Sequence, residues 1–204
     1  MISKTQLRKQ VAQLVSNTSV TERREQSRLV LNKLLGHPKY QQANRLSIYL
    51  STENELDTRP ILEHALGVGG KQCFIPLVRK PQKLNDGDPA TRMIMVELKS
   101  MQDYQNLPVN NYGIKEPEVC GLRAIANPQE ANLDLVLVPG VAFALDGRRL
   151  GHGRGYYDEF LADWAARAQR PLYSIGLALR EQLVEEQFPT IEGHDFVLDE
   201  VLAG

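Results

Sequence analysis

The stretch Leu133-Asp-Leu-Val-Leu-Val-Pro139 does most to decide the fold of this 204-residue chain. It is apolar at nearly every position, a pattern typical of a central strand that is buried on both faces of a sheet. The strand-like character continues to Phe143, and a glycine-rich loop at 151–155 then leads into a helix-like run from Tyr157 to Arg167. A strand, a loop and a helix in this order predict a βα unit of an α/β protein.

Strand-like and helix-like runs alternate along the rest of the chain. The predicted strands are 45–50, 72–77, 93–98 and 171–178, with a last short strand near 191–200. The predicted helices begin at Ser3 and Thr21 and cover about 58–66, whereas 79–88 reads as a loop and 100–128 as irregular. This alternation predicts a three-layer α/β fold, in which a mainly parallel sheet carries helices on both faces. We expect a single domain over residues 1–204, because a chain of this length forms one good core.

Two helix starts have recognisable capping residues. Ser3 is the predicted cap of a first helix whose apolar residues Leu7, Val11 and Leu14 share one face. Thr21 is the predicted cap of the second helix. Both helices are expected to pack an apolar face against the sheet.

The composition excludes several classes of function. Lys and Arg number 24 and Asp and Glu 25, so the net charge of −1 provides no global attraction for nucleic acid. The two cysteines, Cys73 and Cys120, are too few for a disulfide framework, which fits a reducing cytoplasm. No window approaches the roughly 20 apolar residues of a membrane span, and the N-terminal residues lack an export signal. A cytoplasmic protein that binds neither membrane nor nucleic acid is expected.

The loop Gly151-His-Gly-Arg-Gly155 has the composition of a phosphate site. Alternating glycines let a ligand approach the backbone, and the N–H groups that begin the next helix point toward a bound anion. Arg148, Arg149 and Arg154 add positive charge, and Asp158 adds a carboxylate that suits a magnesium-bound nucleotide phosphate. The glycine spacing matches neither a P-loop nor a dinucleotide fold. A plain connection between strand and helix is the alternative interpretation.

The Asp-Gly pair at 146–147 predicts a tight turn within 145–150, just before the glycines. The loop is therefore expected to form a small hairpin that folds over its ligand.

Other charged residues fall at places where a second ligand wall is expected. Glu55 and Asp57 lie between a predicted strand and the following helix, although Asp57 and Thr58 equally suit a helix cap. Lys4 and Arg8 share one helix face and are able to meet one phosphate, or else they belong to a solvated surface.

Three further residues are candidates for the site: one carboxylate near the C-terminus and two histidines. Asp195 is a candidate to complete a metal site with Asp158, or else a turn residue. His152 and His194 are possible general bases, but neither accompanies a nucleophile motif.

Several blocks together resemble the 5-formyltetrahydrofolate cyclo-ligase family. They are Lys4-Thr-Gln-Leu-Arg8, Leu50-Ser-Thr-Glu-Asn-Glu55-Leu-Asp-Thr58, Pro139-Gly-Val-Ala-Phe143, Arg149-Leu-Gly-His-Gly-Arg-Gly-Tyr-Tyr-Asp158 and Asp195. The resemblance implies a fold like that of ribose-phosphate isomerases and CoA transferases. It also implies an ATP- and magnesium-dependent closure of 5-formyltetrahydrofolate to 5,10-methenyltetrahydrofolate, with release of ADP and phosphate, by a monomer.

The resemblance further assigns roles by position. Catalytic roles fall to Arg154 and Lys4, and magnesium binding to Asp158 and Asp195. Folate binding falls to Arg8, Leu50, Glu55 and Tyr157. ATP binding falls to Lys4, Thr5, Gln6, Leu7, Arg8, Arg149, Leu150, Gly151, His152, Gly153, Arg154, Gly155, Tyr156 and Tyr157. A further block, Tyr112-Gly-Ile-Lys-Glu116-Pro117, is similar to a pocket wall of the family and carries no assigned role.

Two other functions remain open at this point. A sugar-phosphate isomerase or a CoA transferase would share the inferred architecture, because a fold does not fix a function. A diverged, non-catalytic folate- or nucleotide-binding protein would keep the pocket without turnover.

Overall fold

The computed structural model describes residues 2–78, 93–110, 113, 115–117, 123–130, 132–184, 188–189, 193 and 195–204. Within these residues the main sheet has the strand order β3-β2-β1-β4-β7-β8. Its strands are β1 (Arg45–Ser47), β2 (Gln72–Val78), β3 (Met93–Leu98), β4 (Leu135–Val138), β7 (Tyr173–Ala178) and β8 (Glu200–Ala203). All neighbouring pairs are parallel except β2 and β3, which are antiparallel. The prediction of a mainly parallel α/β sheet is confirmed.

Strand β4 is buried on both faces, as its sequence predicts. Leu135 and Leu137 belong to one apolar cluster and Val136 and Val138 to a second one, and all four side chains are fully buried. The alternation follows from the two-residue period of a strand. The two clusters are the cores on opposite faces of the sheet.

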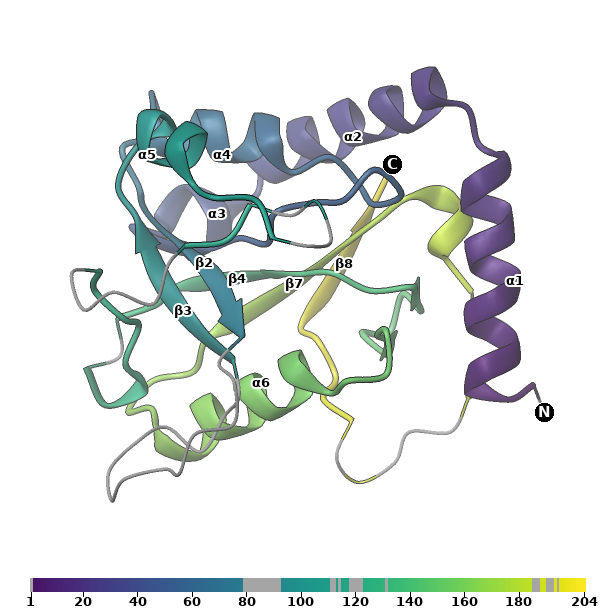
Figure 1. Ribbon diagram of the computed structural model, residues 1–204. Helices are drawn as coiled ribbons and strands as arrows, with labels where there is room; N and C mark the ends of the chain where they lie inside the picture. The colour runs from purple at the N-terminus through teal and green to yellow at the C-terminus, as the bar shows by residue number, and fades with distance from the viewer. Residues whose placement is uncertain are drawn as a thin grey trace.

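Helices cover both faces of this sheet, which gives three layers (Figure 1). The helices α2 to α5 lie on one side, α6 lies on the other, and α1 stands beside η2 at one end. The helices are α1 (Lys4–Asn17), α2 (Val20–Leu35), α3 (Pro38–Gln42), α4 (Arg59–Leu66), α5 (Met101–Asn106) and α6 (Tyr156–Arg167), with short 3-10 turns η1 (Pro128–Glu130) and η2 (Arg180–Gln182). No helix in the described part of the chain is long and apolar enough to cross a membrane.

The first two helices differ in detail from their predictions. Ser3 caps α1 as expected, but Leu14 is 53% exposed and Val15 is buried in its place. Residues 7, 11 and 15 follow one ridge at intervals of four, and this ridge is the one that packs inward. Helix α2 begins earlier than predicted, because the Ser19 hydroxyl accepts a hydrogen bond from the Glu22 N–H and Thr21 lies inside the first turn.

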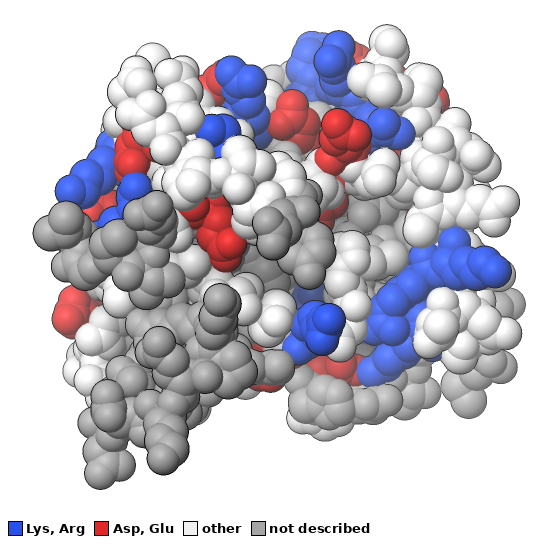
Figure 2. Space-filling view, in the orientation of Figure 1, with Lys and Arg blue, Asp and Glu red and all other residues white. Residues whose placement is uncertain are grey.

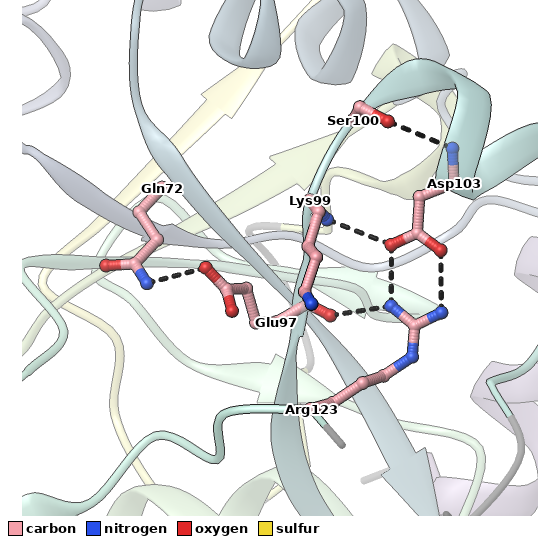
Figure 3. Close-up of polar contacts among 6 residues, drawn as sticks. All are labelled: Gln72, Glu97, Lys99, Ser100, Asp103 and Arg123. Carbon is pink, nitrogen blue, oxygen red and sulfur yellow. Dashed lines mark hydrogen bonds and ion pairs between the residues drawn. The ribbon is translucent and has the colours of Figure 1, made fainter.

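The region predicted to be irregular contains a short helix, α5, which a polar network fixes to the sheet (Figure 3). Ser100 caps this helix, and Arg123 donates to both carboxylate oxygens of Asp103 at 2.6 and 2.7 Å. Arg123 also donates to the Glu97 carbonyl at 2.9 Å, so one guanidinium joins α5 to the end of β3. These partners lie about 20 or more residues apart, and local sequence patterns do not detect them.

The predicted hairpin before the glycine loop is present. Its strands β5 (Ala142–Phe143) and β6 (Arg149–Leu150) pair antiparallel. Gly147 in the turn has φ +90°, and a Cβ there would collide with the Leu198 carbonyl oxygen. The turn therefore requires the glycine that the sequence provides. The predicted loop at 79–88 lies outside the described residues.

Candidate active site

A cavity of about 400 Å³ opens where helix α1 faces the β5–β6 hairpin and the start of α6. Its lining combines three distant parts of the chain: Lys4, Arg8, Pro139, Arg149, Leu150, Gly151, His152, Gly153, Arg154, Gly155, Tyr156, Tyr157, Asp158 and Asp195. In Figure 2, Lys and Arg side chains gather on both sides of this cavity, and Asp or Glu side chains lie near them. The structure thus brings together most of the residues that the sequence predicted for phosphate binding.

The backbone of the glycine loop suits close approach of a ligand. Gly153 and Gly155 have φ values of +94° and +71°, a region that side chains disfavour. A Cβ on Gly153 would lie 3.5 Å from the Arg8 guanidinium, so the absence of a side chain keeps that cation accessible. Gly155 is the N-cap of α6 and provides no side-chain cap, and the first-turn residues Tyr156, Tyr157 and Asp158 line the cavity.

Helix α1 is fixed to this loop by two polar contacts. Arg8 Nε donates to the Gly151 carbonyl at 2.8 Å, and Lys4 Nζ lies 2.8 Å from Asp195 Oδ2. Lys4 and Arg8 are four residues apart and project from one face of α1, as predicted from their spacing. Both side chains line the cavity and do not belong to a fully solvated surface.

Arg149 and Asp158 form the most buried ion pair of the site. Their side chains are 4% and 17% exposed, and Arg149 Nη2 lies 2.8 Å from Asp158 Oδ1. Asp158 also accepts a hydrogen bond from the Phe196 N–H at 3.2 Å, and Arg149 Nε has no hydrogen-bond partner among the residues that the structure describes. Since a buried charge needs its counterion, the pair fixes the loop to the first turn of α6.

Asp158 and Asp195 line the same cavity as the basic side chains. Magnesium in nucleotide sites is usually held by one or two carboxylates together with phosphate oxygens and water. Two carboxylates in a cavity that suits phosphate fit this donor set. The described residues contain no group of three or more His, Cys, Asp or Glu side chains placed to bind a metal.

Glu55 lines a second cavity of about 430 Å³ between the start of α2 and the loop after β1. Its side chain is 15% exposed, and Oε1 lies 3.8 Å from His152 Nε2 on the glycine loop. Burial alone would raise the pKa of Glu55, but the nearby His152 side chain and the hydrogen bonds from Thr52 outweigh it and keep this pKa below the usual value. The Glu55 carboxylate is therefore ionised at neutral pH, and it links the two cavities.

Tyr157 lies between Arg149 and Glu55. Its hydroxyl is buried and has no hydrogen-bond partner in the described part of the chain, and burial raises the pKa of Tyr157 far above the usual value. The Arg149 guanidinium lies 5.9 Å from the centre of the tyrosine ring. A buried hydroxyl without a partner is uncommon, and here it lines the cavity where a ligand would offer one.

Some predicted site residues lie elsewhere. Thr5 and Gln6 are exposed on α1, and Leu7 is buried in the core, because only positions 4 and 8 of this helix face the cavity. Leu50 packs partly buried against the core. The Asp57 carboxylate accepts from the Arg59 N–H, which fits the capping alternative.

The remaining candidates are separate from both cavities or are not described. Thr58 is the N-cap residue of α4 by position, but its hydroxyl donates to the Tyr49 carbonyl and makes no side-chain capping hydrogen bond. Glu116 accepts from the Asn110 amide at 3.1 Å, and none of the cavity-lining residues comes from its block. Tyr112, Ile114, Cys120 and His194 lie outside the described residues.

The fold and the site together define a class: an α/β protein with a cavity of basic side chains and glycines beyond the carboxyl end of a central strand. Comparisons with known proteins then give the family. The profile of the 5-formyltetrahydrofolate cyclo-ligase family matches residues 1–204. The chain belongs to the 5-formyltetrahydrofolate cyclo-ligase family and is an enzyme of the ligase class.

Individual relatives agree with this assignment. The chain is 35% identical to the 5-formyltetrahydrofolate cyclo-ligase of Mus musculus over 96% of its length and 91% of the relative. It is 36% identical to a probable 5-formyltetrahydrofolate cyclo-ligase of Caenorhabditis elegans, over 98% and 91% of the two chains. The NMR structure of Aquifex aeolicus 5,10-methenyltetrahydrofolate synthetase superposes with a TM-score of 0.73 at 30% identity, covering 98% of this chain and 89% of that one. These names support cyclo-ligase activity.

Proposed function

We propose that this protein closes 5-formyltetrahydrofolate to 5,10-methenyltetrahydrofolate with ATP and Mg²⁺, releasing ADP and phosphate. The observation that carries the proposal is the single cavity in which Lys4, Arg8 and Arg154 meet the glycine loop and two carboxylates. A cavity that is lined by basic side chains and by the first turn of a helix suits a polyphosphate. The proposal agrees with the activity for which the relatives are named.

The chemistry explains why such a site needs no nucleophile. The oxygen of a formamide is a poor leaving group, so phosphorylation of that oxygen by ATP converts it into phosphate, which leaves readily. The neighbouring folate nitrogen then attacks the activated carbon and closes the ring. For phosphoryl transfer a protein mainly aligns the reactants and neutralises charge.

We assign each of these tasks to particular residues of the cavity. Lys4 and Arg8 approach from α1 and would hold phosphate oxygens, while Arg154 would stabilise the charge on the transferring group. The N–H groups at the start of α6 would bind the same oxygens. Glu55 would accept N–H donors of the folate at the neighbouring cavity.

Asp158 and Asp195 are the residues that would hold Mg²⁺. When bound, the ion would offset phosphate charge and help to align the nucleotide. Each carboxylate also contacts a cation of the site, Arg149 and Lys4 respectively. The same carboxylates would thereby orient these two basic side chains.

The direct test mixes the protein with 5-formyltetrahydrofolate, ATP and Mg²⁺ and follows the absorbance of the methenyl product. We expect product only when both ATP and Mg²⁺ are present. Absence of product with folate or nucleotide binding retained would support the non-catalytic alternative. Absence of binding as well would favour the phosphosugar or CoA alternatives. A monomeric state in the cytoplasm is part of the same proposal, and light scattering would test the monomer.

A further inference from the structure

The loop between β1 and α4 is closed at its base by reciprocal hydrogen bonds. The Ser51 N–H donates to Thr58 Oγ1 at 3.2 Å, and the Thr58 N–H donates to Ser51 Oγ at 3.1 Å. Thr58 Oγ1 in turn donates to the Tyr49 carbonyl at 2.7 Å. These hydrogen bonds fix the two ends of the β1–α4 loop to each other, just after strand β1.

At the tip, Thr52 binds one oxygen of the Glu55 carboxylate with two donors. The Thr52 N–H donates to Oε2 at 2.8 Å and the Thr52 hydroxyl donates to the same oxygen at 2.9 Å. The Glu55 N–H donates back to the Thr52 carbonyl at 3.2 Å, which completes a local turn. A carboxylate oxygen accepts about two hydrogen bonds, so the two donors of Thr52 occupy both acceptor sites of Oε2.

The other oxygen, Oε1, faces the glycine loop. It lies 3.8 Å from His152 Nε2, beyond hydrogen-bond distance, while the Glu55 side chain remains largely buried. The two oxygens of one carboxylate thus have different surroundings. Oε2 is held within its own loop, and Oε1 is directed toward the other wall of the site.

We propose that Thr52 is a positioning residue, which holds Glu55 through Oε2 so that Oε1 is the acceptor for N–H donors of the folate ring. This inference rests on the proposed function and adds to it a residue with a defined task. Thr52 is exposed, so its hydroxyl is not needed to fill the core. A short polar side chain with two donors to one oxygen explains why the carboxylate has a single orientation.

The test compares Thr52→Val with Thr52→Ser in the full-length protein. Valine keeps the shape and the backbone donor but removes the hydroxyl donor, whereas serine retains it. Thr21→Val is the matched control, because Thr21 is exposed on α2 and makes no part of either cavity. Thermal unfolding of all four proteins should show that each variant is folded.

We expect Thr52→Val to raise the KM for 5-formyltetrahydrofolate about tenfold, the factor equivalent to one hydrogen bond to a charged group. The KM for ATP should stay within about twofold, and Thr52→Ser should restore the folate KM to within about twofold. The acid limb of kcat/KM for folate should move to higher pH in Thr52→Val, because the carboxylate loses a donor that stabilises its charged form.

Equilibrium binding of 5-formyltetrahydrofolate, measured by calorimetry, separates this inference from the proposed function. If the wild type binds folate without turnover, the proposed function fails, and the affinities of the variants still test Thr52. An unchanged folate affinity in Thr52→Val would overturn the positioning role, as would a loss in Thr52→Ser equal to that in Thr52→Val. A wild type that neither binds nor converts folate would overturn both.

Discussion

Removal of the Asp158 carboxylate should destabilise the folded protein far more than removal of an exposed carboxylate from the same hairpin region. Asp158→Ala would leave the Arg149 guanidinium only 4% exposed and without its counterion. Within the described residues Arg149 Nε already has no hydrogen-bond partner, and the Nη1 contact to the Pro139 carbonyl is long at 3.4 Å. Breaking a buried ion pair in this way typically costs about 3–5 kcal/mol.

Asp146→Ala is the matched control, since it removes the partner of the neighbouring Arg148. Asp146 is 57% exposed, and such surface pairs contribute less than about 1 kcal/mol. Thermal and urea unfolding of the two variants, without ligands, would give the comparison. For a chain of this size a loss of about 3–5 kcal/mol lowers Tm by about 6–20 °C, and the control should shift by less than about 4 °C.

A double variant tests the physical reason. Arg149→Met together with Asp158→Ala removes both charges, so it should be more stable than Asp158→Ala alone. Equal destabilisation by Asp158→Ala and Asp146→Ala, or a double variant less stable than the single one, would refute the reasoning that a buried unpaired cation is responsible.

Three other substitutions give distinct expected outcomes. Arg154→Ala should lower kcat about 100-fold or more while the KM for ATP changes less, because charge stabilisation is lost mainly in the transition state. A wild-type kcat in steady-state kinetics would show that Arg154 has no catalytic role. Glu55→Gln should raise the KM for 5-formyltetrahydrofolate without a similar change for ATP, and equal folate affinity in calorimetry would exclude Glu55 from the pocket. Arg123 lowers the pKa of Asp103 by hydrogen bonding, so this pair stabilises the fold above the usual Asp pKa and the contribution is lost as pH falls through the lowered value. Arg123→Gln should therefore reduce the loss of unfolding free energy between about pH 5 and pH 2, and identical pH dependence of urea unfolding in both proteins would argue against this contribution.

The sequence predicted the elements whose signal is local. The apolar run at 133–139 predicted a doubly buried strand, Ser3 predicted a helix cap, and the Asp-Gly pair predicted the hairpin; the structure confirms all three. Periodicity placed the wrong residue on one face, since Leu14 and Val15 both fit an amphipathic helix and only packing distinguishes them. The cap of α2 was shifted for a similar reason, because Ser19 and Thr21 are both acceptable caps.

The sequence by itself determined the alternation of strands and helices, the glycines that the loop requires and the family blocks in their order. These features can be predicted because the backbone conformation of a residue, and the periodic pattern of buried side chains, depend on neighbours only a few residues away. The tertiary structure alone decided that Lys4 contacts Asp195, that Arg149 is buried against Asp158, and that Glu55 lies 3.8 Å from His152. The first of these contacts joins residues 191 positions apart, and only the folding of α1 against the end of the sheet brings them within hydrogen-bond distance.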